Sequence, residues 1–151
     1  MQPTNEHAVD VLNSLIETTL DSANGYREAA ENADRSQFKD MFLQRSQRRE
    51  QLARRLQDEV RSFGGEPETD QSVIGKAHNK FVDIKNALAG GADDKAVIDE
   101  VERGEDVIKA KFEKVLDDQR LPQQARELIH EAYGSIRADH DEVSRLKHQT
   151  H

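Results

Sequence analysis

The stretch from Val97 to Leu116, VIDEVERGEDVIKAKFEKVL, decides the fold of this chain. Its apolar residues recur at helical spacing and share one stripe on a wheel at about 100° per residue: Val97, Val101, Ile108, Phe112 and Val115. Glu105 falls inside that stripe. Because carboxylates are almost never fully buried unless they are paired or bound to a metal, the residue that Glu105 faces is the main question that the sequence raises.

The composition favours one all-α domain over residues 1–151. The chain is rich in Ala, Leu, Glu, Gln, Arg and Lys, which favour helix, and no strand-like alternation competes with the helical pattern. A length of 151 residues is enough to bury a core. Charged residues make up 34% of the chain and no apolar run approaches the length of a transmembrane helix, so we expect no membrane segment.

Other features of the composition bear on location and on partners. The chain has no cysteine, and its first residues, MQPTNEHAVD, lack the basic and apolar regions of a signal peptide, so we expect a cytoplasmic protein. The formal net charge of −8 argues against nucleic-acid binding, because binding to phosphates needs a positive surface.

Apolar stripes predict five helices, over residues 4–33, 36–63, 70–88, 94–118 and 122–147. Asp34 and Ser36 are candidate N-caps of the second helix, and Gly64 follows its last apolar residue as a stop signal. Short turns join helices one and two and the last two helices, which predicts a four-helix bundle of two antiparallel hairpins. The short helix, with Phe81 and Ile84, would lie across the outside or one end of the bundle and offers a surface for a homo-oligomer, most simply a dimer.

Four charged residues from three helices lie on the apolar stripes. Arg45 and Arg49 lie near the centre of the second stripe, Glu105 lies in the fourth and Asp139 in the fifth. Burying one such charge alone is costly, whereas two arginines and two carboxylates can neutralise one another. The pattern therefore predicts a buried polar network. In the alternative, the arginine stems lie on the core and their charged heads reach water.

Two histidines, His130 and His140, are candidate metal ligands by spacing or by position. Glu127 and His130 have the Glu-x-x-His spacing of di-iron bundle proteins, but on the wheel both point away from the apolar face. His140 lies at the edge of the stripe of its helix and is the histidine nearest to the expected core.

Several segments resemble a known family. They are LNSLIE (12–17), DSANGYREAA (21–30), FLQRSQRREQLA (42–53), GGEP (64–67), EVERGED (100–106) and DHD (139–141). With them, the chain resembles an uncharacterised bacterial family of ferritin-like four-helix-bundle domains of unknown function, and residues 42–53 resemble the second helix of ferritins. The resemblance implies the ferritin-like fold and supplies no established activity.

The resemblance to ferritins also implies where the iron ligands of the first two helices would fall. The glutamate of the first helix corresponds to Thr19. The Glu-x-x-His motif of the second helix corresponds to Arg49 and Leu52, so a cation stands where a ligand is expected.

The last two helices retain more of the ferritin pattern. Glu105 keeps a carboxylate, and Asp139 and His140 offer two further donors. The glutamate expected three residues before the histidine is replaced by Arg137. Because di-iron chemistry needs several carboxylates and open coordination positions, the resemblance implies an incomplete di-iron site.

These observations support two hypotheses of function. The first is a non-catalytic bundle without a metal cofactor that acts through contacts with other proteins, in the stress-related setting of many ferritin-like proteins. The alternative is a metal-binding ferritin-like oxidase or ferroxidase, with iron or another divalent metal at a displaced site drawn from Glu50, Glu102, Glu105, Asp139 and His140. The two differ in whether the carboxylates converge with His140 or an arginine occupies that space.

Overall fold

The computed structural model describes residues 5–69 and 94–150. In these two ranges there are four helices and no strand: α1 (Asn5–Asn32), α2 (Ser36–Ser62), α5 (Asp94–Glu113) and α6 (Gln123–Thr150). The expected all-α architecture with four long helices is confirmed. The expected short helix over residues 70–88, with Phe81 and Ile84, lies outside the described residues.

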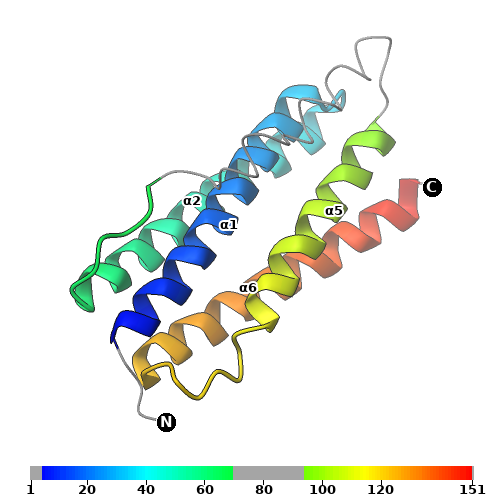
Figure 1. Cartoon of the computed structure of the whole chain (residues 1–151). Coiled ribbons are helices and arrows are strands. Elements are labelled where there is room, and N and C mark those ends of the chain that lie inside the picture. Colours follow the sequence, from blue (N-terminus) through cyan, green and yellow to red (C-terminus); the bar gives the residue numbers. More distant parts are fainter. Residues whose placement is uncertain (1–4, 70–93, 151) are drawn as a thin grey trace.

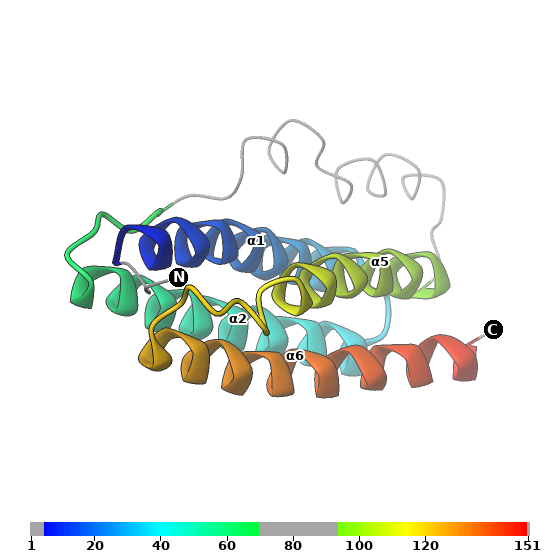
Figure 2. The same ribbon diagram turned by 60° about the horizontal axis from the view of Figure 1, so that its bottom comes forward.

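The four helices form a bundle of two antiparallel hairpins, α1–α2 and α5–α6 (Figures 1 and 2). Across the two hairpins, α1 packs against α5 and α2 faces α6. The directions in Figure 1 show that α1 and α6 run one way and α2 and α5 the other. No helix in the described part of the chain is long and apolar enough to cross a membrane.

The start of α2 differs from the expected capping. The N-cap is Arg35, which has an extended backbone and makes no side-chain capping bond. The Asp94 carboxylate at the start of α5 instead accepts hydrogen bonds from the backbone amides of Asp34 and Arg35, at 2.6 and 3.3 Å. This contact fastens one hairpin to the other. It joins residues about sixty positions apart, so a local sequence pattern could not predict it.

The end of α2 follows the expected stop signal. Gly64 has φ of +80°, a left-handed conformation that is costly for residues with a side chain. The amide of Gly64 donates to the carbonyl of Arg61 at 2.9 Å, and the amide of Gly65 donates to the carbonyl of Val60 at 3.0 Å. These are the two hydrogen bonds of a Schellman motif.

We expect Gly64→Ala to destabilise the protein by about 1 kcal/mol, because alanine is strained at positive φ. Gly134→Ala is the matched control. Gly134 lies inside α6 with no atom within 4 Å of an added Cβ, so this change should stabilise the protein by up to about 1 kcal/mol. Denaturant unfolding of the two variants measures both effects. A loss of stability in both would mean that the loss in Gly64→Ala does not come from the left-handed backbone of Gly64.

The end of α5 comes earlier than expected. The helix ends at Glu113 instead of near residue 118. The amides of Val115 and Leu116 bond to carbonyls only three residues back, at 3.2 and 3.4 Å, so the chain winds more tightly than an α-helix. The turn that follows places Leu121, which is 1% exposed, against the core before α6 begins.

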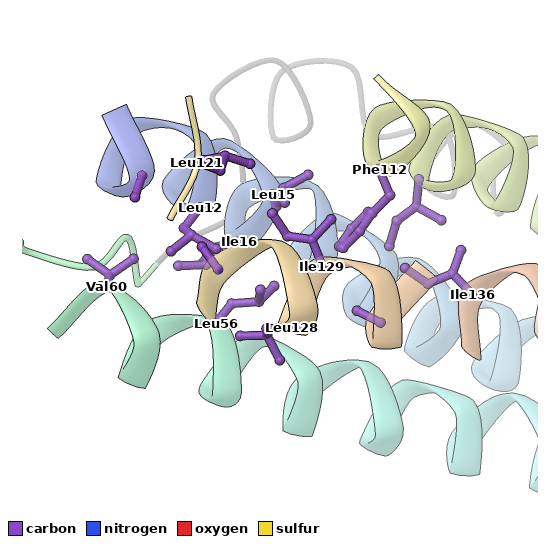
Figure 3. Packing of buried hydrophobic residues seen from close by; sticks show 14 residues of the cluster. Leu12, Leu15, Ile16, Leu56, Val60, Phe112, Leu121, Leu128, Ile129 and Ile136 are labelled. Carbon is purple, nitrogen blue, oxygen red and sulfur yellow. The ribbon is translucent and has the colours of Figure 1, made fainter. Parts of the chain in front are cut away.

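Among the described residues, the apolar core contains two clusters, one towards each end of the bundle. The larger cluster, at the end with the α5–α6 loop, is shown in Figure 3 and includes Leu12, Leu56, Phe112 and Ile129. The smaller lies at the end with the α1–α2 turn and has these buried members: Tyr26, Ala29, Ala30, Ala33, Phe38, Phe42, Val97, Ile98, Val101 and Val143. Between the two clusters, each helix carries at least one buried polar or charged residue: Thr19, Arg45, Arg49, Glu105 and Asp139.

Candidate functional site: a buried charge layer

A layer of polar and charged side chains separates the two apolar clusters. We call it the central charge layer; its buried members are Tyr26, Arg45, Arg49, Glu105 and Asp139. Tyr26 also belongs to the smaller apolar cluster, where its ring lies beside that of Phe42. Their exposed fractions lie between 1% for Glu105 and 6% for Asp139. All four helices contribute, because Tyr26 belongs to α1, the arginines to α2, Glu105 to α5 and Asp139 to α6.

Arg49 lies at the centre of this layer. Its Nη1 and Nη2 atoms lie 3.0 Å from Oε1 and Oε2 of Glu105, which makes a bidentate pair. Nη2 also donates to Oδ2 of Asp139 at 3.1 Å, and Nη1 donates to Oγ of Ser22 at 2.7 Å. The guanidinium therefore lies between a carboxylate of α5 and a carboxylate of α6 and bonds to both.

Tyr26 connects the two arginines to Glu105. Its hydroxyl donates to Oε1 of Glu105 at 2.6 Å and accepts a bond from Nη1 of Arg45 at 3.2 Å. The guanidinium carbons of Arg45 and Arg49 both lie 5.5 Å from the centroid of the Tyr26 ring, a distance at which cation–π attraction acts. Tyr26 thus interacts with three charged groups while itself neutral.

The layer continues to the surface between α2 and α6. Nε of Arg45 lies 3.5 Å from Oδ1 of Asp139, and Nη2 of Arg45 donates to Oε1 of Glu142 at 2.8 Å. Arg48, whose side chain is 55% exposed, also pairs with Oδ1 of Asp139. Both acceptor oxygens of Asp139 are therefore bonded to arginines.

The charges of the layer and its surface partners balance. Three arginines face three carboxylates: Arg45, Arg48 and Arg49, with Glu105, Asp139 and Glu142. Within the described ranges, every buried side-chain nitrogen or oxygen has a hydrogen-bond partner. A buried ionic network is tolerated when it is neutral and fully bonded.

The surroundings shift the pKa values of the layer. Burial, followed by the charge of Glu105, raises the pKa of Tyr26 well above its ordinary value, so the phenol stays protonated and donates to Glu105. Burial alone would lower the pKa of Arg49, but Glu105, Tyr26 and Asp139 outweigh it and raise that pKa. Tyr26, Asp139 and Glu142 raise the pKa of Arg45 against burial in the same way.

The positions on α1 and α2 where the resemblance to ferritins implies iron ligands carry Thr19, Arg49 and Leu52. Thr19 is fully buried, and its hydroxyl donates to the carbonyl of Leu15 at 2.7 Å. Arg49 bonds to the carboxylates as described, and Leu52 is partly buried against the larger apolar cluster. Glu127 and His130 are exposed, as the helical wheel predicts.

The alternative metal ligands are separated and engaged elsewhere. Glu50 is half-exposed and pairs with Arg54 at 3.8 Å. Glu102 accepts bonds from Ser144 and Lys147, at 3.0 and 2.7 Å.

His140 makes its contacts at the surface between α5 and α6. Its Nε2 lies 2.6 Å from Oδ1 of Asp106, and its Nδ1 lies 3.3 Å from Oδ1 of Asp141. It does not share a site with Glu105 and Asp139, which bond to Arg49. In the described part of the chain, no three or more His, Cys, Asp or Glu side chains gather as a metal site requires.

Sequence reasoning missed Tyr26, a buried member of the layer, and the two surface partners Arg48 and Glu142. Tyr26 lies at helical spacing with the apolar residues of α1, so periodicity alone places it in the core. A buried tyrosine hydroxyl usually needs a hydrogen-bond partner, and that need is the available signal. Glu142 closes the layer from α6 at a position with 46% of its side chain exposed, and no sequence signal distinguishes it from other surface glutamates.

Comparison with known protein families identifies the chain. A family model matches residues 7–118, and the family is described as "Domain of unknown function (DUF2383)". The chain belongs to this family. A comparison with curated proteins gives no match.

The DUF2383 match covers α2, α5 and all of α1 except its first two residues, and it ends before α6. Tyr26, Arg45, Arg49 and Glu105 lie within the matched residues, whereas Asp139 lies beyond them. The membership agrees with the resemblance to an uncharacterised domain family. The family description assigns no activity.

Proposed function

We propose that this DUF2383 protein is a ferritin-like bundle in which a charge network takes the place of a di-iron site, and that it acts without a catalytic metal. One observation carries the proposal. The guanidinium of Arg49 forms a bidentate pair with Glu105 and bonds to Asp139, where a metal would need open carboxylate oxygens. The permanent positive charge of an arginine stands where a metal cation would otherwise be.

The ferritin-like part of the proposal is supported by the order of the helices. The chain runs along α1, back along α2, and then in that same direction again along α5 before α6 returns (Figure 1). Such a bundle needs one long connection between its hairpins, which is the topology of ferritin-like folds. A fold does not by itself imply an activity. The bonds from Arg49 to Glu105 and Asp139 are what speak against di-iron chemistry.

The remaining parts of the proposal describe how the protein acts. The buried charges of residues 5–69 and 94–150 are paired and fully bonded, and this part of the interior offers no free reactive group. We therefore propose that the chain acts through protein contacts, as a homodimer in the cytoplasm of a bacterium under stress. The net charge of −8 supports protein partners over nucleic acid, and the composition supports a soluble protein that does not associate with membranes.

Anaerobic titration with Fe(II), followed by exposure to oxygen, tests this function. We expect no stoichiometric iron binding and no rapid oxygen consumption, because Arg49 already bonds to both central carboxylates. Elemental analysis of the native protein should likewise find no metal near one equivalent. Tight binding of two irons per chain would overturn the proposal and favour the alternative of a displaced oxidase site. Light scattering on the same preparation measures whether the chain is the proposed dimer.

A further inference from the structure

Two consecutive residues on α5 face two consecutive residues on α6 at the level of the central charge layer. The inner members, Glu105 and Asp139, are joined by the guanidinium of Arg49. The outer members, Asp106 and His140, join directly at 2.6 Å. The contact between α5 and α6 at this level therefore has an inner bridge of fixed charge and an outer bridge that can gain or lose a proton.

The geometry of the outer bridge selects the protonated imidazole. Nε2 of His140 faces an oxygen of Asp106, and Nδ1 faces an oxygen of Asp141 at 3.3 Å. Ionised carboxylates only accept hydrogen bonds, and a neutral imidazole has an N–H at one nitrogen only. Both contacts can be hydrogen bonds at once only if the ring carries a proton on each nitrogen.

The charges around His140 also favour the protonated imidazole. The ring is 18% exposed, and acidic groups on α5 and α6 surround it together with one lysine: Glu102, Asp106, Lys109, Glu113 and Asp141. Burial alone would lower the pKa of His140, but the hydrogen bonds to Asp106 and Asp141 outweigh it and raise that pKa above 6.5.

We propose that His140 is a proton-operated latch between α5 and α6. The charged imidazole ties α6 to Asp106 of α5. After deprotonation the ring loses its positive charge and keeps a single N–H for the two carboxylates, so its attraction to Asp106 weakens. Because the pKa of His140 is raised in the folded chain, the stabilisation is fully present below the ordinary histidine pKa of 6.5. It is lost as the pH rises through the raised pKa. The α5–α6 contact thus weakens with rising pH near neutrality.

NMR titration of the His140 ring together with amide hydrogen exchange along α5 tests the latch. In the wild type, exchange protection near Asp106, corrected for the intrinsic pH dependence, should fall roughly two- to five-fold between about pH 6 and pH 8, the range of a partly exposed ion pair. Asp106→Asn should lower the pKa of His140 and abolish this fall.

Asp118→Asn is the matched control, because it removes another histidine–aspartate ion pair, which joins His7 near the start of α1 to Asp118 beyond the end of α5 at 2.7 Å. This variant should keep the His140 titration and the pH-dependent protection of the wild type. The latch is overturned if protection in the wild type does not change with pH. It is equally overturned if Asp106→Asn leaves the His140 titration unaltered.

Discussion

Arg49→Met is expected to lower the free energy of unfolding by about 3–5 kcal/mol, the usual effect of removing one partner from a buried ion pair. Methionine fills much of the same volume, so the loss is not that of a cavity. The cost arises because Glu105 and Asp139 lose a cation that bonds to both, while each stays almost fully buried. Denaturant unfolding followed by circular dichroism measures the change.

Arg48→Met provides the matched control. Arg48 lies on the same helix and pairs with Asp139, but its side chain is 55% exposed. Exposed ion pairs contribute at most about 1 kcal/mol, so this variant should lose far less stability than Arg49→Met. Equal losses in the two variants would show that burial of Arg49 is not the source of the effect.

Glu105→Ala is expected to cost a similar amount, about 3–5 kcal/mol, and to cost at least about 1 kcal/mol more than Glu105→Leu. Both changes remove the carboxylate that Arg49 and Tyr26 bond to. Alanine also leaves a cavity at a site that is 1% exposed, whereas leucine fills it.

The double variant Arg49→Met/Glu105→Leu sharpens this prediction. It removes both charges of the bidentate pair, so its loss should be smaller than the sum of the two single losses. Additive losses would mean that the two side chains contribute independently. Negligible effects of both Glu105 variants would mean that this carboxylate is solvated in solution.

Much of the fold follows from simple periodicity. The stripes of Leu12, Leu56, Ile108 and Ile129 predict which face of each helix is buried, because a helix buries one face at fixed spacing. The inward positions of the four charged residues follow from the same wheels, since a charge in the middle of a stripe must lie near the core. Gly64 predicts the end of α2 because few other residues tolerate its backbone conformation.

The parts of the fold and of the charge layer that periodicity does not predict depend on contacts between residues far apart in the sequence. The packing of the two hairpins brings Asp94 to the amides of the α1–α2 turn. The same packing brings Glu105 to both Tyr26 and Arg49. The early end of α5 also depends on tertiary structure, because the apolar stripe continues to Val115 although the α-helix does not. Local patterns predict which face is buried but not which partner lies opposite it.

The position of the central charge layer, between two apolar clusters, has a consequence for how the helices align. Sliding α6 by one turn along α2, about 5.4 Å, would move Asp139 away from Arg49 and set its carboxylate among aliphatic side chains. Apolar packing alone tolerates such a shift far better, since one leucine or isoleucine can replace another. The layer therefore fixes the lengthwise alignment of the bundle, and misaligned arrangements are excluded by the cost of an unpaired buried charge.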